Sequence, residues 1–117
     1  MTVPSIGCDE LRAKLENDGG VVVVDALPPI SFAHSHLPGA INLPPRDVSP
    51  SVVKRLPDRD AEIVVYCANP TCEDSVDTAN RLVELGYTNV RHYPGGKDEW
   101  RRCGFPLERA GAPLELS

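Results

Sequence analysis

Cys67 and Cys72 lie on either side of a short loop that follows a β-branched stretch ending at Tyr66. This pattern predicts a strand that ends at Tyr66, a loop over residues 68–73 and a helix that begins at about Asp74. The N–H groups of such a loop and the positive end of the helix dipole can stabilise a thiolate at Cys67. The same donors can hold an anion or a persulfide, which makes Cys67 the candidate nucleophile. The alternative is an inert thiol buried at the end of a strand.

Cys72 has two interpretations that the sequence leaves open. As a resolving thiol, it would attack a persulfide on Cys67, form a disulfide and release sulfide. Otherwise it is a small residue that packs under the loop, because the loop geometry decides whether two sulfurs can meet. Cys8 and Cys103 have no cysteine nearby in sequence, and we expect them to be structural or incidental. The cysteine spacings and the His34-x-His36 pair, without a third ligand nearby, predict no metal site.

The elements that must position Cys67 alternate along the chain. Helices are predicted over residues 5–17, 28–33, 49–56, 74–85 and from 95 through Trp100, and strands over 21–25, 40–43, 62–66 and 89–93. We expect Ser5 to cap the first helix, Val76 to share the apolar face of the 74–85 helix, and Gly86 to end that helix. The alternation predicts an α/β fold with a mainly parallel sheet flanked by helices, in which ligands bind at the carboxyl ends of strands.

Length, charge and hydropathy limit the classes of function. A chain of 117 residues suits one domain over residues 1–117, and a net charge of −5 argues against non-specific binding to nucleic acid or to an anionic membrane. Apolar runs such as Val21 to Val24 are too short to span a bilayer. Residues 1–20 lack the basic start and apolar stretch of a targeting signal, so we expect a cytoplasmic protein.

Several segments, in this order, resemble the landmarks of the rhodanese family. Val22–Asp25 is similar to its first strand, His36–Pro44 (H-L-P-G-A-I-N-L-P) to its most specific signature, and Val64–Cys67 to the strand that delivers the catalytic cysteine. The resemblance implies a rhodanese-like three-layer fold, and a Cys67 that accepts sulfane sulfur from thiosulfate, another small donor or a protein persulfide. It also implies that the sulfur passes to cyanide or a thiol acceptor, with no metal or organic cofactor.

The loop after Cys67 resembles that of a subset of rhodanese-like proteins with a Y-C-x-N/G-P-x-C pattern. The residues expected to contact substrate are Ala68, Asn69, Pro70, Thr71, Cys72, Glu73, Asp74 and Ser75. Glu73 and Asp74 stand where the family often has Arg or Lys. Their carboxylates would oppose a dianion such as thiosulfate by up to roughly 1 kcal/mol each, and so favour persulfide donors. The alternative is that they complement the N-terminus of the next helix, with Asp74 as its cap.

Three other functions compete with sulfur transfer. Phosphatases and arsenate reductases of related fold need C-x5-R, and Glu73 occupies the Arg position, which argues against this chemistry. A non-catalytic rhodanese-like module that binds or regulates a partner is compatible with the small size and the acidic loop. A thiol redox switch between Cys67 and Cys72 is the third alternative.

Overall fold

The structure is a computed structural model that describes residues 3–17, 20–69 and 71–109. The helices are α1 (Cys8–Glu16), α2 (Pro29–His34), α3 (Asp74–Glu84) and α4 (Gly96–Arg102), with the short 3-10 helices η1 (Pro45–Asp47) and η2 (Pro50–Lys54). The strands are β1 (Val22–Asp25), β2 (Ile41–Asn42), β3 (Ile63–Tyr66) and β4 (Val90–Tyr93). Strands and helices alternate along the chain, which confirms the predicted α/β fold.

The four strands form one parallel sheet in the order β2-β1-β3-β4. After β1 the chain builds β2 on one side, and it then crosses to place β3 on the other side of β1. The direction of building therefore reverses between β1 and β3, and in open α/β sheets ligands bind outside the carboxyl ends of the strands at such a point. Asp25 pairs with Tyr66 in register, so β1 and β3 end side by side.

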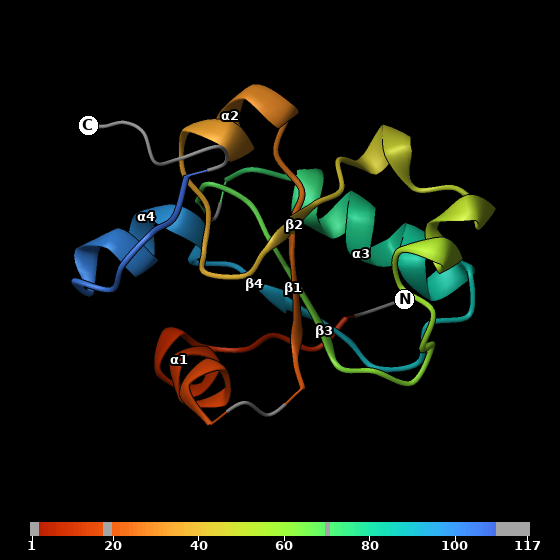
Figure 1. The fold of residues 1–117 in the computed structure, drawn as a ribbon, viewed down its shortest axis with the longest axis horizontal. Coiled ribbons are helices and arrows are strands. Elements are labelled where there is room, and N and C mark those ends of the chain that lie inside the picture. Colours follow the sequence, from red (N-terminus) through yellow and green to blue (C-terminus); the bar gives the residue numbers. More distant parts are fainter. Residues whose placement is uncertain (1–2, 18–19, 70, 110–117) are drawn as a thin grey trace.

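Helices cover both faces of the sheet (Figure 1). Val24 and Val65 join an apolar cluster with Leu82 of α3, on the side that also carries η1 and η2. Val23 and Val64 join a second cluster with residues of α1 and α4 on the opposite side. Successive residues of a strand point to opposite faces, so a strand buried on both faces needs a continuous apolar run. This is the physical reason for the Val21–Val24 stretch, and it confirms the three-layer arrangement.

The prediction that Ser5 caps the first helix is wrong. Helix α1 begins at Cys8 with Gly7 at the N-cap position, and no side chain caps it. Ser5 instead forms a parallel bridge with His92, where the N–H of Ile6 donates to His92 O at 2.9 Å and the N–H of His92 donates to Pro4 O at 2.8 Å. The backbone before α1 therefore extends the sheet beside β4, and the helix starts only after that pairing ends.

The apolar face of α3 also differs from the prediction at one position. Val76 is 40% exposed, whereas the buried residues of α3 are Ser75, Thr78, Ala79 and Leu82. The buried stripe has the three-to-four spacing of a helix, and Val76 lies off it. Gly86 ends this segment as predicted, because its φ of +99° lies in the left-handed region that favours glycine.

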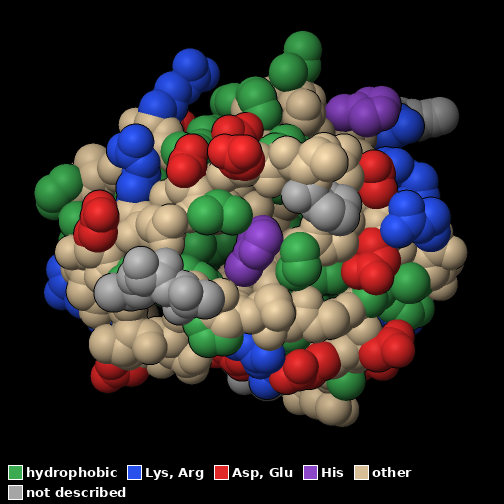
Figure 2. Space-filling model, turned by 180° about the vertical axis from the view of Figure 1, so that it is seen from behind, with side chains coloured by type: hydrophobic (Ala, Val, Ile, Leu, Met, Phe, Trp, Pro, Cys, Tyr) green, Lys and Arg blue, Asp and Glu red, His purple; other side chains and the backbone are tan. Residues whose placement is uncertain are grey.

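The surface carries charges of both signs. Acidic and basic side chains are interspersed over the face seen in Figure 2, as expected for a globular surface with a small net charge. Within residues 3–17, 20–69 and 71–109, no helix has both the length and the apolar character that crossing a membrane requires.

Candidate active site

Cys67 follows β3 directly and lies at the carboxyl edge of the sheet, beside the end of β1. The N–H of Ala26 donates to the carbonyl of Tyr66 at 3.0 Å, so the chain after β1 lies against the chain that enters Cys67. Cys67 is only 1% exposed. The residue therefore stands at the reversal point between β1 and β3, where the topology predicts a ligand site.

The structure joins Cys67 to Cys72 by a disulfide bond, with the two Cα atoms 6.2 Å apart. This separation is within the ordinary range for bridged cysteines. Cys72 therefore meets the sulfur of the candidate nucleophile and is not merely a packing residue under the loop. Cys67 becomes available as a nucleophile only after this bond is reduced, because the thiolate is the reactive form.

Asn69 shapes the loop between the two cysteines. Its side-chain Oδ1 accepts hydrogen bonds from the N–H of Thr71 at 3.1 Å and from the Thr71 hydroxyl at 2.7 Å. Its carbonyl accepts from the N–H of Cys72 at 3.2 Å. These two amides were expected to surround the Cys67 sulfur, but in the disulfide-bonded loop they bind Asn69, because a local turn satisfies them first. Pro70, which was expected to contact substrate, lies outside the described residues.

The first residues of α4 bind the backbone carbonyls of Cys67 and Ala68. The N–H of Lys97 donates to Cys67 O at 3.1 Å, and the N–H of Asp98 donates to Ala68 O at 2.9 Å. Gly96 has a φ of +62°, and a Cβ placed there would lie 2.4 Å from Cys67 O. Only glycine allows this approach. The sequence signal for this contact was the Gly95-Gly96 pair before a helix, and our sequence reasoning did not connect it to the site.

Lys97 also fixes the segment around α2 through a buried ammonium group. Its Nζ donates to the carbonyl of Ser35 at 2.8 Å and to the carbonyl of Ser31 at 3.3 Å. Lys97 is 7% exposed, and burial lowers the pKa of its ammonium group. The residue that supports Cys67 through its backbone therefore ties α4 to α2 through its side chain.

A buried acid and a phenol hold the ends of β1 and β3 together. The Tyr66 hydroxyl donates to Asp25 Oδ2 at 2.6 Å, and the N–H of Leu27 donates to Asp25 Oδ1 at 2.8 Å. The hydroxyl of Tyr66 also accepts from the N–H of Leu37 at 2.9 Å. Burial raises the pKa of the Asp25 carboxyl and of the Tyr66 hydroxyl. Asp25 therefore binds the backbone of the turn after β1, together with Tyr66, whose role sequence reasoning missed.

The acidic residues of the loop differ in position from the expectation. Glu73, not Asp74, occupies the N-cap of α3, and no side chain caps that helix. The prediction of Asp74 as the cap is therefore wrong. A carboxylate oxygen of Asp74 lies within 4.8 Å of the sulfurs of Cys67 and Cys72. Two thiolates and a carboxylate could together hold a thiophilic metal ion after reduction, but the disulfide bond occupies both sulfurs.

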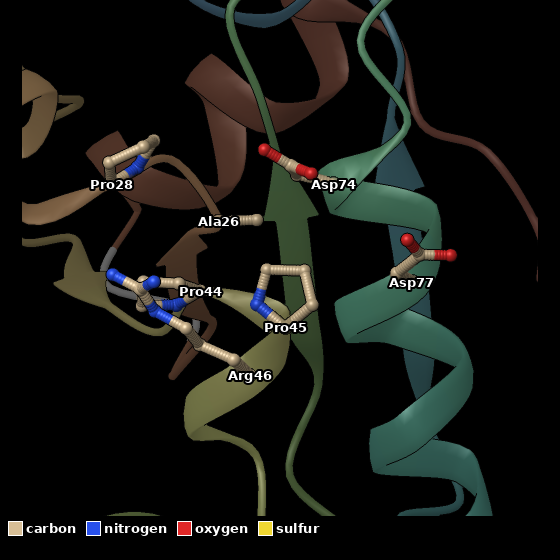
Figure 3. Close-up of a pocket in the computed structure, with 7 residues that line it drawn as sticks. All are labelled: Ala26, Pro28, Pro44, Pro45, Arg46, Asp74 and Asp77. Atoms are coloured by element: carbon tan, nitrogen blue, oxygen red, sulfur yellow. The ribbon is translucent and has the colours of Figure 1, made fainter.

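A cavity of about 290 Å³ opens beside Asp74, between the ends of β1 and β2 and the first turn of α3 (Figure 3). Its lining residues are Ala26, Pro28, Pro44, Pro45, Arg46, Asp74 and Asp77. Figure 3 shows Asp74 and Asp77 along the α3 wall and Arg46 on the η1 wall. Asp74 belongs both to this cavity and to the group around the two sulfurs, whereas neither Cys67 nor Cys72 lines the cavity.

Ser75 does not reach the predicted substrate side. It is fully buried, and its hydroxyl lies 2.8 Å from Nε2 of His92 on β4. Glu73 and Thr71 are exposed, whereas Ala68, Asn69, Cys72 and Asp74 are half-buried around the loop. The structure therefore brings Cys67, Cys72 and Asp74 together and leaves Ser75 in the packing beneath them.

Comparisons with known proteins relate this chain to rhodanese-like domains and sulfurtransferases. The family model for the rhodanese-like domain matches residues 8–103. Thiosulfate sulfurtransferase GlpE of Haemophilus influenzae is 36% identical over 91 residues, which cover 78% of this chain and 83% of that protein. The HTH-type transcriptional regulator Rv0324 of Mycobacterium tuberculosis is 34% identical over 96 residues, covering 82% of this chain but 41% of the regulator. The chain thus matches less than half the length of that regulator.

The fold is also found among solved structures. The crystal structure of the BH2092 protein from Bacillus halodurans superposes with a TM-score of 0.85 at 25% identity. The match covers 97% of this chain and 85% of that one. The likeness therefore extends over nearly the whole chain.

Proposed function

Because the chain belongs to the rhodanese-like domain family, we propose that it is a sulfurtransferase that carries sulfane sulfur as a persulfide on Cys67. The observation that carries this proposal is the position of Cys67, directly after β3 and at the reversal point of a parallel sheet. The thiosulfate sulfurtransferase relatives of similar length support the same class of reaction.

The reaction begins with reduction of the Cys67–Cys72 disulfide by a thiol. The Cys67 thiolate then attacks the outer sulfur of thiosulfate or of a donor persulfide. The S–S bond of the donor breaks, and sulfite or the donor thiolate leaves with the electron pair. An acceptor thiolate or cyanide finally attacks the outer sulfur on Cys67, takes it and releases the Cys67 thiolate. A reducing compartment such as the cytoplasm would keep Cys67 available for this cycle.

Asp74 bears on the choice of donor. Its half-buried carboxylate lies within 4.8 Å of the sulfurs, where it repels a dianion more than it repels a neutral or singly charged donor. Asp77 adds a second negative charge along the same wall of the cavity. We therefore propose that a persulfide is a better donor than thiosulfate. The cavity beside Asp74 would admit the thiol portion of a small persulfide donor.

Mass spectrometry of the reduced protein tests the proposal. Incubation with thiosulfate or a small persulfide should add one sulfur atom to the peptide that contains Cys67, and cyanide should remove it as thiocyanate. The Cys67→Ser variant should gain nothing. If the reduced and folded wild-type protein gains no sulfur from either donor, sulfur transfer is wrong and a non-catalytic binding module is favoured.

A second function is favoured by the disulfide itself. A bond between Cys67 and Cys72 protects the nucleophile from further oxidation and turns off sulfur transfer until a thiol reduces it. After the reduced wild-type protein is exposed to peroxide, the segment that contains Cys67 and Cys72 should lose two hydrogens, and dithiothreitol should restore activity. The Cys72→Ser variant should instead accumulate sulfinic acid on Cys67 and stay inactive. Equal recovery of the two proteins would contradict this protective role.

A further inference from the structure

A second pair of cysteines meets outside the loop that joins Cys67 to Cys72. The Sγ atoms of Cys8 and Cys103 lie 3.4 Å apart, although the residues are 95 positions apart in the chain. Both are free thiols. Neither residue has a cysteine nearby in sequence, but the tertiary fold brings together two segments that the sequence separates. Cys8 begins α1 and Cys103 directly follows α4, and these two helices lie on the same side of the sheet (Figure 1).

The backbone on both sides of this pair is held in place. Cys8 is the first residue of α1 and comes two positions after Ile6, whose N–H donates to His92 O on β4 at 2.9 Å. Cys103 follows α4 directly, and its N–H donates to the carbonyl of Glu99 at 2.9 Å. The Arg12 guanidinium of α1 lies 4.2 Å from the centre of the Phe105 ring, which joins the two segments beside the thiols.

We propose that Cys8 and Cys103 form a second redox-active pair, which low-molecular-weight disulfides convert to a reversible disulfide bond. An S–S bond is about 2.05 Å long, so the two sulfurs must approach by only about 1.4 Å from their 3.4 Å separation. Since the ends of α1 and α4 are already adjacent, side-chain rotation supplies most of that movement. This pair is separate from Cys67 and does not depend on sulfur transfer.

The exposure of the two thiols sets the order of the reaction. Cys103 is exposed, whereas Cys8 is 7% exposed and burial raises the pKa of its thiol to about 11. Cys103 therefore attacks the small disulfide first, which breaks the S–S bond of the reagent and releases one thiolate. Cys8 then attacks the Cys103 sulfur, and its proton passes to the second departing thiolate. Two protein thiols are oxidised, and one disulfide is reduced to two thiols.

The bond would tie α1 to the residue that follows α4. A crosslink between residues 95 positions apart restricts the unfolded chain strongly, so the unfolding midpoint should rise by about 10 °C or more. Helix α4 also supports the Cys67 backbone through Lys97 and Asp98, so the same bond would fasten the support of the candidate active site to α1.

The test uses the full chain with Cys67→Ser and Cys72→Ser, so that only one cysteine pair remains. Incubation with bis(2-hydroxyethyl) disulfide should remove two hydrogens and leave a peptide crosslink between Cys8 and Cys103. The melting temperature should rise, and dithiothreitol should reverse both changes. A circular dichroism spectrum that matches the wild-type spectrum shows that the variant is folded.

Single replacements in that background separate the two steps. Cys8→Ser should retain a lasting mixed disulfide on Cys103, because the second nucleophile is missing. Cys103→Ser should stay unmodified while folded, because Cys8 is buried. A lasting mixed disulfide on Cys103 while Cys8 is present, or no reaction at either residue, would overturn the proposal and leave the function of Cys67 unaffected.

Discussion

The molecule holds two cysteine pairs that differ in how they are brought together. Cys67 and Cys72 are five positions apart, at the two ends of one loop at the carboxyl edge of the sheet. Cys8 and Cys103 are 95 positions apart and meet where α1 begins and α4 ends. The first pair is local and lies within 4.8 Å of a carboxylate oxygen of Asp74, whereas the second pair combines a buried Cys8 with an exposed Cys103. Proximity of two sulfurs is therefore not enough to define a catalytic site, since position relative to the sheet matters as well.

The largest expected difference between the two pairs is in sulfur-transfer activity when one cysteine of each pair is replaced. Cys67→Ser should lower sulfur transfer by at least roughly 10³-fold, because a serine hydroxyl is a far weaker nucleophile and cannot carry sulfane sulfur at neutral pH. Cys103→Ser should retain wild-type kcat/KM with thiosulfate and cyanide. The measurement is thiocyanate formation by the reduced proteins. A similar loss in both variants would contradict the division of roles.

Replacement of Gly96 tests the close approach of α4 to the Cys67 backbone. Gly96→Ala should destabilise the protein by about 2–4 kcal/mol for two reasons. The new Cβ must displace the Cys67 carbonyl, and the alanine backbone must adopt a left-handed φ. The matched control is Gly39→Ala, at a similar φ of +74° with no atom within 4 Å of the added Cβ. That change should cost about 1 kcal/mol. Urea unfolding measures the loss of stability, and mass spectrometry measures the loss of persulfide formation on Cys67. Equal losses in the two variants would show that the contact between residue 96 and the Cys67 carbonyl adds nothing to the effect of the left-handed φ.

The negative charge of Asp74 beside Cys67 and Cys72 should affect the reactivity toward an anionic donor more than it affects the stability of the fold. Asp74→Asn keeps the shape of the side chain but removes its charge, and should raise kcat/KM for thiosulfate by about fivefold. Asp77→Asn changes an exposed residue of the same cavity and should have less than about a twofold effect. Steady-state kinetics at low ionic strength checks both values. No gain for Asp74→Asn would indicate that this carboxylate does not select the donor.

The smallest expected effect concerns His92, which lies between the two regions. Its side chain contacts Ser75 near the loop, and its backbone holds the segment that leads to Cys8. Burial lowers the pKa of His92 below its ordinary value of about 6.5, so the unfolded chain takes up a proton that the folded chain does not. The free energy of unfolding should therefore fall as pH falls through that value toward the lower folded pKa.

Urea unfolding at several pH values between about pH 7 and pH 5 measures this slope. His92→Gln should lose stability less steeply than the wild-type protein, whereas His34→Gln, at an exposed position, should keep the wild-type slope. Parallel slopes for the wild-type protein and His92→Gln would show that this histidine contributes nothing to the pH dependence.

Local pattern was enough for most of the fold. The β-branched runs predicted β1 and β3, the glycine at 86 predicted the end of α3, and the alternation of elements predicted a parallel sheet. Each of these depends on the preference of a residue for its own backbone conformation or on a period within one element. Ser5 and Val76 were misjudged because neighbours distant in the sequence decide their surroundings: β4 pairs with the segment around Ser5, and Val76 points away from the sheet.

The amino-acid sequence by itself determined which thiol ends a central strand, because strand and loop signals are local. Only the tertiary structure decided that Asp74 lies beside the sulfurs, that Gly96 and Lys97 support the Cys67 backbone, and that Cys8 meets Cys103. Such contacts depend on how whole helices pack across a sheet, and a packing arrangement is a property of many residues together. No spacing between two cysteines 95 positions apart carries that information.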